Sequence, residues 1–404
     1  MKRHISAAVT RVLMCAAVVP IPAVAAEIMP AGEPVMTDTV AADPAAHHSV
    51  VGKVKSLAGK VIDYFGNSNK HRSGGAMDFS VIGGPYYTSD MGLGLGIVAS
   101  GIYGHGVDDD VTPPSNVSLF GKVSTKGFGS LGIRGTHISR SEAQRFNYRL
   151  EVLCDPSDFW GIGYEMDNND ANESRMRRIG VQLRGEALFK VLPDFYVGPV
   201  LSYDFVKAHD IERPELLDGE RTTTWAGGAG VTLSYDTRDV LTYPHRGVYV
   251  TVSQMFYPKF VGNHYAFSST SIQADWYHSV WKGGVVALDF RSELNYGSPS
   301  WYMLASVGGS YYLRGYYEGR YRDKGMMSFQ AELRQRVWRR SGAVLWAGAG
   351  SVFARPSEIM MRRMLPNVGV GYRWEFKKDV NVRLDVGMGK SGQWGFIFNI
   401  NEAF

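Results

Sequence analysis

Arginine and tyrosine side chains are concentrated in the stretch 311–325, which reads YYLRGYYEGRYRDKG. Five tyrosines and three arginines surround three glycines, and only Glu318 and Asp323 balance the cations. Aromatic rings that stack on bases, beside guanidinium groups that bind phosphates, are what a groove for single-stranded nucleic acid uses. The formal net charge of +4, however, is spread along the chain and forms no basic block that would indicate a polyanion partner. The chemistry of this stretch therefore depends on the element that carries it.

Two glycine-rich stretches resemble nucleotide-binding loops, but their spacing fails. Gly389-Lys390-Ser391 would need a glycine five positions before Gly389, where the chain has Leu384. The run GLGLG at 92–96 is followed by Ile97, where a dinucleotide fingerprint would need another glycine. We interpret both stretches as small residues on strands and predict no cofactor.

Metal and catalytic groups are equally sparse in the sequence. The pair His47-His48 has no second pair of ligands nearby, so no metal site is predicted. No serine stands in a nucleophile elbow. Glu332 could in principle act as a catalytic acid, but an ion pair with Arg334 or Arg336 accounts for it better. We expect that the protein is not an enzyme.

The first 25 residues indicate export. Lys2, Arg3 and Arg11 precede the apolar run 12–19, and the small residues of 23–25 offer a cleavage site, which predicts a signal peptide over 1–25. A lipoprotein anchor at Cys15 is disfavoured by the large Met14 before it. Cys154 is then the single cysteine of the mature chain, so no intramolecular disulfide is expected.

Residues 26–75 are predicted to form a short periplasmic extension. A Pro/Ala-rich run at 29–34 leads into the segment 50–65, where apolar residues recur at three- and four-residue steps between lysines. This pattern predicts one amphipathic helix. It leaves open whether the helix lies on the membrane, plugs a lumen or packs on a partner.

From Ala76 onward the apolar period changes to two, which is typical of strands with chemically different faces. In 326–338, for example, Phe329 and Leu333 alternate with Gln330 and Glu332. Runs of about 9 to 13 alternating residues match the tilted length that crosses a bilayer, where a closed barrel leaves no unpaired edge in lipid. Residues 76–404 therefore predict an all-β fold, a transmembrane antiparallel β-barrel whose charged face lines the interior.

The alternating segments suggest about sixteen strands. They are 76–85, 91–104, 115–124, 127–139, 144–154, 173–189, 193–207, 222–236, 246–257, 264–279, 283–296, 326–338, 342–355, 365–377, 379–389 and 392–403. If the first strand rises from the periplasm, the short connections lie on the periplasmic side of the membrane and the long ones on its outer side. The exceptions are 105–114 and 237–245, which are long periplasmic connections. The stretch 311–325 then belongs to the longest outer loop.

At this loop the sequence resembles a known family. Leu313-Arg314-Gly315-Tyr316, then Arg322-Asp323-Lys324, then Glu332-Leu333-Arg334 look like the signature of the BamA/TamA superfamily of outer-membrane proteins, the bacterial surface antigens. The resemblance implies that the loop folds back into the lumen and that its Arg-Gly-Tyr tip contacts the inner wall.

Other stretches resemble the same family. The group Asp236, Arg238 and Asp239, with Gly247, resembles its periplasmic turn between the eighth and ninth strands, and 159–163 (FWGIG) and 82–86 (IGGPY) also fit. The final residue Phe404 resembles the C-terminal signal by which barrels are recognised for assembly.

Two departures from the family pattern stand out. The fifty residues of 26–75 cannot hold even one of the family's POTRA repeats, so we expect a short member that lacks them. The usual partner of the loop arginine is an acid on the thirteenth strand, in a Phe-x-Asp pattern, where this chain has Gly348. Four inward carboxylates are then the candidate partners of Arg314: Asp289, Glu293, Glu332 and Asp385.

The resemblance implies a role in inserting proteins into the outer membrane of a Gram-negative bacterium, or in moving them across it. The implied mechanism is a weak seam between the first and last strands, where a substrate strand pairs with an exposed edge. Its partners would be the outer-membrane bilayer, client outer-membrane proteins, and periplasmic or membrane subunits, with no nucleic acid. The alternative is a passive channel or structural barrel without assembly activity.

Overall fold

The computed structural model describes residues 78–88, 92–104, 115–377 and 380–404, all within one compact unit, Val61–Phe404. The predicted signal peptide over 1–25 and the predicted helix at 50–65 lie outside the described residues. Among the described residues, no helix has the length and apolar content to cross a membrane.

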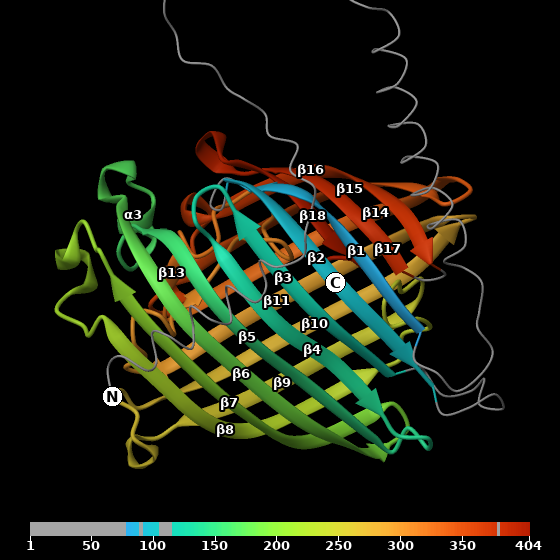
Figure 1. The fold of residues 1–404 in the computed structure, drawn as a ribbon, viewed down its shortest axis with the longest axis horizontal. Helices are drawn as coiled ribbons and strands as arrows, with labels where there is room; N and C mark the ends of the chain where they lie inside the picture. Colours follow the sequence, from blue (N-terminus) through green and yellow to red (C-terminus); the bar gives the residue numbers. More distant parts are fainter. Residues whose placement is uncertain (1–77, 89–91, 105–114, 378–379) are drawn as a thin grey trace, which may run out of the picture. The chain divides into compact units, whose positions relative to one another are not determined.

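Within the described residues, sixteen strands form one sheet in which each strand pairs antiparallel with the next strand of the sheet, and Figure 1 shows their arrangement. They are β1 (Asp78–Thr88), β2 (Gly92–Tyr103), β3 (Ser115–Ser124), β4 (Gly129–Ile138), β5 (Gln144–Phe159), β6 (Ser174–Leu192), β7 (Phe195–His209), β8 (Thr223–Asp236), β9 (Gly247–Tyr257), β10 (Phe267–Trp281), β11 (Gly284–Gly297), β14 (Gly325–Trp338), β15 (Ser341–Phe353), β16 (Leu365–Lys377), β17 (Val380–Met388) and β18 (Trp394–Ile400). The predicted all-β transmembrane barrel is confirmed.

The two faces of the wall differ in chemistry, as the two-residue period predicts. On β2 the outward residues Leu93, Leu95 and Ile97 are more than half exposed, as a surface in contact with lipid must be. On β14 the inward residues Gln330 and Glu332 are buried inside the barrel. The wall is thus apolar towards lipid and polar towards the lumen.

The last strand is shorter than the sequence predicted. The alternation predicted a strand up to residue 403, but β18 ends at Ile400. Asn401 adopts the left-handed φ of 66°, and its N–H donates to the carbonyl of Asn381 at 2.7 Å. This conformation turns the chain out of the sheet, so the residues after Asn401 do not continue the strand as predicted.

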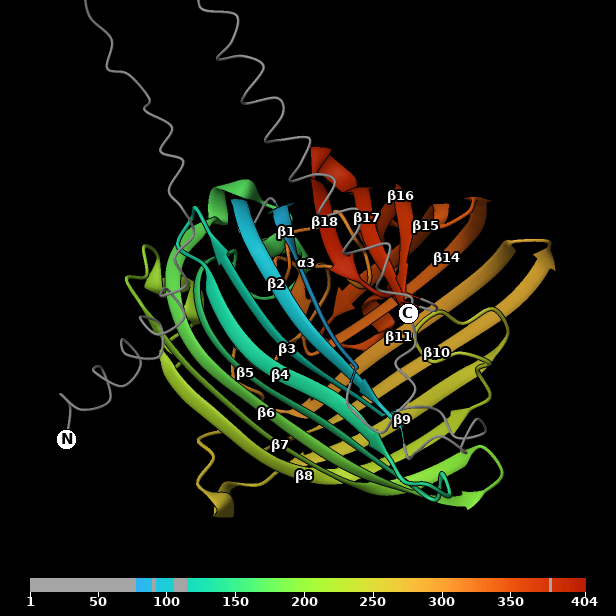
Figure 2. The same cartoon turned by 45° about the vertical axis from the view of Figure 1, so that its right-hand side comes forward.

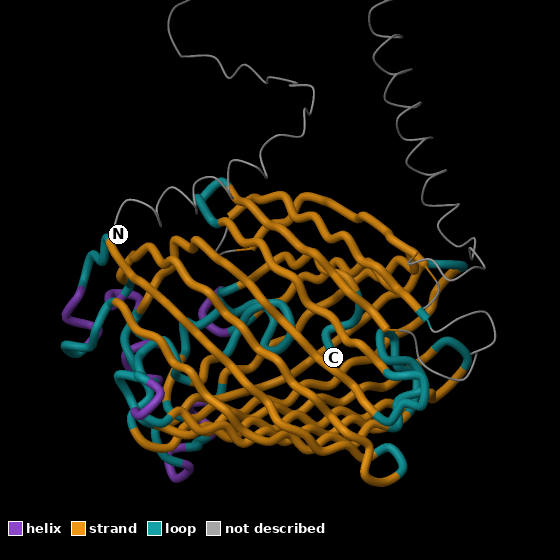
Figure 3. The backbone as a smooth tube through the Cα atoms, turned by 60° about the horizontal axis from the view of Figure 1, so that its bottom comes forward, coloured by secondary structure: helices purple, strands orange, loops and turns teal. Residues whose placement is uncertain are grey.

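Short and long connections alternate along most of the sheet, as the sequence predicted. Short turns join β6 to β7, β10 to β11 and β14 to β15. The long loops carry the small elements α3 (Tyr164–Asp167), η1 (Asp170–Asn172), η2 (Pro214–Leu217), η3 (Lys259–Val261), η4 (Pro356–Glu358), η5 (Met361–Arg363) and η6 (Lys390–Gly392). The loop 298–324, with β12 (Ala305–Ser306) paired to β13 (Arg322–Asp323), contacts the inner wall through Arg314, and Figure 3 shows loop segments inside the ring of strands.

The two ends of the sheet meet at a seam. Backbone pairing runs continuously from β1 to β18, and within the described residues β1 and β18 form no ladder with each other, although they lie side by side (Figure 2). Apolar side chains make contact across the seam instead. Val98 of β2 packs against the cluster of Val382 and Ile400.

Candidate functional site: a loop tip seated in the lumen

The loop 298–324 is anchored near the outer ends of the strands by contacts with neighbouring loops. The buried Trp301 donates from its backbone N–H to Glu220 Oε2 at 2.9 Å and from its indole to the carbonyl of Arg221 at 3.1 Å. At the other end of the loop, the backbone N–H of Arg322 donates to Asp167 Oδ2 at 2.9 Å. The loop is therefore fixed at both ends before it reaches the lumen.

Glycines on the wall make room for the loop tip. A Cβ on Gly387 of β17 would collide with the carbonyl of Arg314, and one on Gly350 of β15 would stand 2.5 Å from the Leu313 side chain. A Cβ on Gly389 would stand 2.7 Å from the ring of Tyr316. The stretch that resembled a phosphate-binding loop is thus part of a seat on which the backbone of the tip rests.

The tip itself has the backbone conformation of a tight turn. Leu313 has a φ of 46° and Gly315 a φ of 111°, and both values lie in the region that favours glycine. The hydroxyl of Tyr316 donates to the carbonyl of Pro366 at 2.6 Å and accepts from the N–H of Lys390 at 2.8 Å. These contacts hold the turn against β16 and η6.

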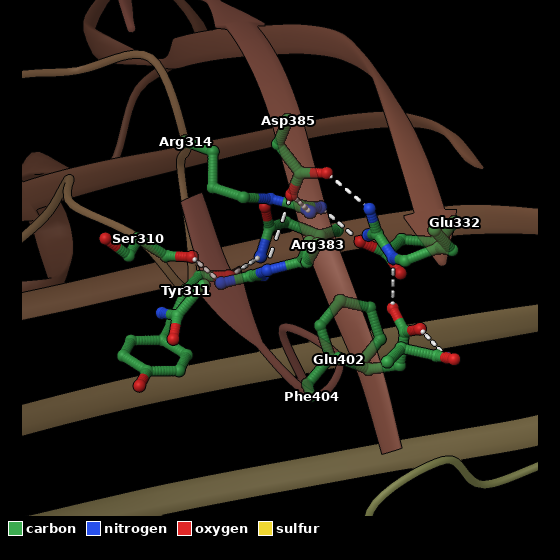
Figure 4. A network of polar contacts seen from close by, with 12 residues as sticks. Ser310, Tyr311, Arg314, Glu332, Arg383, Asp385, Glu402 and Phe404 are labelled. Carbon is green, nitrogen blue, oxygen red and sulfur yellow. Dashed lines mark hydrogen bonds and ion pairs between the residues drawn. The ribbon is translucent and has the colours of Figure 1, made fainter. Parts of the chain in front are cut away.

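The side chain of Arg314 is fully buried and has two carboxylate partners (Figure 4). Its Nη1 donates to Asp385 Oδ2 at 2.7 Å, and its Nη2 donates to Glu332 Oε1. The guanidinium also lies 3.8 Å from the ring centroid of Trp346 on β15. Two charge-assisted hydrogen bonds and one cation–π contact together compensate the desolvation of the buried cation.

Of the four candidate partners, the structure brings Glu332 and Asp385 to Arg314 and leaves the other two apart. Asp289 accepts instead from Arg291 Nε at 2.9 Å and from Gln330 Nε2 at 3.3 Å. Glu293 lies further along β11, and no hydrogen bond joins it to Arg314 among the described residues.

Gly348 cannot supply the acid that the family pattern places there. A Cβ at this position would stand 2.6 Å from both Asn367 Oδ1 and the carbonyl of Phe329. Asn367 in turn donates from Nδ2 to the carbonyl of Arg314 at 3.3 Å. The space that an aspartate would need is therefore filled, and β15 contacts the loop arginine through Trp346.

Sequence reasoning missed two arginines around Asp385. Arg373 donates from Nη1 to Asp385 Oδ1 at 2.5 Å, and Arg383 Nη1 lies 3.6 Å from Asp385 Oδ2. The two arginines are directly opposite each other in the ladder of β16 and β17. The two-residue alternation of β16 and β17 could have predicted both arginines, since it directs their side chains into the lumen on the side of Asp385.

Electrostatics inside the loop are set by burial and by nearby arginines. Burial acts to raise the pKa of Tyr311, but Arg134 and Arg383 outweigh it and lower this pKa to about 7. In the outer loop, burial raises the pKa of Asp167 well above its ordinary value. Burial and the neighbouring Arg178 lower the pKa of Arg322 to about 10, so the guanidinium stays charged at neutral pH.

The predicted periplasmic turn between β8 and β9 is held by its two aspartates. Asp236 accepts from Arg145 Nη1 and from Arg238 Nε, each at 2.8 Å. Asp239 Oδ1 accepts three backbone N–H groups, from Val240, His245 and Arg246. Gly247 has a φ of 113°, and a Cβ there would collide with the carbonyl of Thr237. The long inner connection is thus an ordered turn.

Within the described part of the chain, no group of three or more His, Cys, Asp or Glu side chains is placed to hold a metal ion. Glu332, the acid that could in principle be catalytic, is committed to Arg314 and to Arg334, whose Nε donates to it at 2.9 Å. The arrangement is suited to holding a loop in place.

The comparison with family models decides the family, because the Omp85 superfamily domain matches residues 135–404. The chain belongs to the Omp85 superfamily. As in other members, its barrel lies in the outer membrane of a Gram-negative bacterium. No curated protein matches the chain.

Solved Omp85 barrels share the fold at low sequence identity. BamA from Haemophilus ducreyi lacking POTRA domains 1-3 is 13% identical with a TM-score of 0.52, over 80% of this chain and 69% of that one. CdiB from Escherichia coli is 11% identical with a TM-score of 0.53, over 80% of this chain and 61% of that one. CdiB from Acinetobacter baumannii is 12% identical with a TM-score of 0.51, over 80% of this chain and 59% of that one. The chain thus spans about three-fifths of each CdiB structure.

Proposed function

We propose that this Omp85 barrel inserts client proteins into the outer membrane or moves them across it. The observation that carries the proposal is the seam, since β1 and β18 lie side by side without a backbone ladder among the described residues. An unpaired strand edge is a template on which another strand can form hydrogen bonds. The step requires no catalytic residue, so the proposed activity is not enzymatic.

The proposal includes a chain organisation and a set of partners. Residues 1–25 would be a signal peptide, 26–75 a periplasmic extension and 76–404 the barrel. Client outer-membrane proteins would reach the barrel through periplasmic or membrane subunits, for which the segment 50–65 is a candidate contact. The final Phe404 would belong to the signal by which this barrel is itself assembled.

Locking the seam tests the proposal. Val98 packs against the cluster that contains Ile400, so the variant Val98→Cys/Ile400→Cys, with Cys154→Ser, places two thiols across the seam, and the disulfide between them is verified by mass spectrometry before the assay. The barrel is reconstituted in liposomes, and the folding rate of a urea-denatured eight-stranded client barrel is measured with the disulfide oxidised and reduced. We expect acceleration by the reduced form and none by the oxidised form.

The matched control places the disulfide away from the seam. Val252 and Ile272 are directly opposite in the ladder of β9 and β10, so Val252→Cys/Ile272→Cys joins two strands that already pair. Oxidation of this control should leave the client folding rate unchanged. Equal acceleration by the oxidised and reduced forms of the Val98–Ile400 variant would contradict the proposed role of the seam.

A further inference from the structure

The residues after β18 form a tail that occupies the lumen. Phe404 is buried against Tyr277 of β10 and Ala287 of β11. Arg334 of β14 donates from Nη2 to the carbonyl of Phe404 at 3.0 Å, and its guanidinium lies 5.2 Å from the centroid of the Phe404 ring. The tail thus reaches wall strands that lie far from β18 in the order of the sheet.

Glu402 fixes the middle of this tail, Asn401–Phe404. Its Oε2 accepts from Arg373 Nε at 2.7 Å, and its Oε1 accepts from Asn381 Nδ2 at 2.9 Å. The side chain is 1% exposed. A buried carboxylate with two good donors is a strong anchor, so the tail is a seated element of the lumen rather than a frayed end.

The tail and the loop tip share one set of ion pairs. Starting at the loop, alternating positive and negative side chains form a closed ring: Arg314, Asp385, Arg373, Glu402, Arg334, Glu332 and again Arg314. The longest link, from Arg334 Nε to Glu402 Oε2, is 3.9 Å, and no member has a side chain more than 4% exposed. Figure 4 shows the loop and the tail meeting at this ring.

Removing one carboxylate from such a ring affects the whole of it. Among the side chains of the described residues, four arginines, with Arg383 as the fourth, share the three carboxylates Asp385, Glu402 and Glu332. If Glu402 leaves, Arg373 and Arg334 each lose a partner in a buried site, where an unpaired charge is costly. Both then compete more strongly with Arg314 for Asp385 and Glu332, which weakens the hold on the loop tip.

We propose that the tail Asn401–Phe404 is a latch for the lumen loop. With Glu402 in the ring, Arg314 stays on the wall; when the tail withdraws, the loop tip is released. The tail directly follows β18, so a displacement of this seam strand also pulls Glu402 out of the ring. The link between seam opening and lumen opening rests on the proposed function, whereas the coupling between tail and loop does not.

Protease access to the loop measures the release. In the protein purified from outer membranes and held in lipid nanodiscs, trypsin cleavage after Arg314 and Arg320 is followed by fragment mass. The variant Glu402→Gln keeps the shape of the side chain and removes its charge. We expect it to raise the cleavage rate at both sites about tenfold, while the barrel still migrates as a folded band. The matched control is Glu375→Gln, which removes the partner of Arg336 in an ion pair outside the ring.

If tail release favours loop release, then loop release must favour tail release by the same free energy. The exposure of the tail is therefore a second readout, which a purely local defect in the loop would not change. Ala403→Cys, with Cys154→Ser, reports tail release by its rate of reaction with a maleimide. Glu402→Gln should raise this rate. Arg314→Gln changes the loop alone, and it should also raise the rate at which the maleimide reacts with the tail. The increase should be about as large as the increase in loop cleavage caused by Glu402→Gln.

Two results would overturn the latch. One is a reactive tail in Glu402→Gln with a loop cleaved as slowly as in the wild type. The other is a tail that stays unreactive in Arg314→Gln although its loop is cleaved rapidly. If Glu402→Gln does not assemble, Glu402→Asp, which keeps the charge but shortens its reach, is judged by the same two rates. Neither readout involves a client, so a negative result leaves the proposed assembly function untouched, and the seam test leaves the latch untouched.

Discussion

At the residue scale, Arg314 shows why an arginine is needed at the loop tip. Its planar guanidinium donates to Asp385 and Glu332 from two different nitrogens while one face lies on Trp346. A lysine ammonium carries the same charge, but it has no flat face to stack and no fixed fork to reach both carboxylates at once. Replacing Arg314 by lysine should therefore destabilise the seated loop less than replacing it by alanine.

We predict that Arg314→Ala destabilises the seated loop by about 3–5 kcal/mol, because it leaves two buried carboxylates without their shared partner. Arg314→Lys should lose less, since the charge remains. The temperature at which the folded band disappears in detergent gels should fall in the order wild type, Lys, Ala. The control Arg336→Ala removes an ion pair with a half-exposed arginine, worth only about 0–1 kcal/mol. Unchanged heat resistance of Arg314→Ala would contradict the pinning of the loop.

A second prediction concerns Gly348. Restoring the usual acid by Gly348→Asp should lower stability, and Gly348→Ala should already do so, because the new Cβ meets Asn367 and the carbonyl of Phe329. Gly185→Ala is the matched control, since nothing lies within 4 Å of a Cβ at that strand position. Urea midpoints of the three variants in detergent micelles measure the effect. A gain of stability in Gly348→Asp would show that the site has room for the family's acid.

The sequence alone could narrow the partners of Arg314 to four carboxylates but could not choose among them. The two-residue alternation within each strand is a local pattern, and it is enough to place four carboxylates on the lumen side: Asp289, Glu293, Glu332 and Asp385. The choice depends on how the ladders of three wall strands align and on how deep the loop inserts. Both are long-range properties that no single-strand pattern contains.

At the element scale, the turn between β8 and β9 is shaped by one backbone position. We predict that Gly247→Ala destabilises the barrel by about 1–3 kcal/mol, because a side chain at a φ of 113° is strained and meets the carbonyl of Thr237. Gly129→Ala, at a position with free space around the Cβ, is the control. Urea midpoints compare the two, and equal midpoints would argue against a conformational role for this glycine.

The outer anchor of the loop should depend on pH through Asp167. Burial raises the pKa of this carboxyl in the folded state above its ordinary 3.8, so the fold favours the protonated form. Its contribution to stability is therefore present at low pH and is lost as pH rises from about 4 through the raised pKa. Asp323, whose pKa burial also raises, contributes with the same sign, whereas Arg322 stays charged over this range.

We predict that Asp167→Asn reduces the loss of unfolding free energy between pH 4.5 and 6.5, because the amide is neutral throughout. Urea unfolding of wild type and variant at both pH values measures the difference. The window stops at 6.5 because the pKa of Tyr311, lowered to about 7 by Arg134 and Arg383 in spite of burial, acts with the opposite sign above it. An identical pH slope in the two proteins would exclude Asp167 as the responsible group.

The strands were largely predictable from the sequence because their pattern is local. Alternation alone placed all sixteen strands and the loop between β11 and β14. The extension of β5 from 154 to Phe159 was missed, since 155–158 (DPSD) reads as a turn, whereas the start of β6 at Ser174 was predicted to within one residue. The end of β18 was missed because the bend at Asn401 is fixed by a hydrogen bond to β17, which the alternation cannot show.

At the scale of the whole barrel, two separate segments among the described residues lie in the lumen. The loop 298–324 enters from the outer side and the tail Asn401–Phe404 from the end of β18, and both reach the ring around Arg314. This arrangement bears on the alternative function. A passive channel needs a continuous aqueous path, and here large side chains such as Tyr316 and Trp301 are buried inside the barrel.

We therefore predict that the intact protein conducts ions poorly in planar bilayers and that removal of the loop tip opens it. Deleting 309–319 joins Gly308 directly to Arg320, which leaves the anchors of Trp301 and Arg322 in place but removes the turn that contacts β15 to β17. Single-channel conductance should rise severalfold on deletion, because the lumen-facing side of the barrel wall is polar and water can fill the vacated space. Deleting 140–142 in the short turn between β4 and β5 is the control and should leave conductance unchanged. A large, steady conductance of the intact protein, with no acceleration of client folding in the liposome assay, would favour the passive channel and overturn the assembly function.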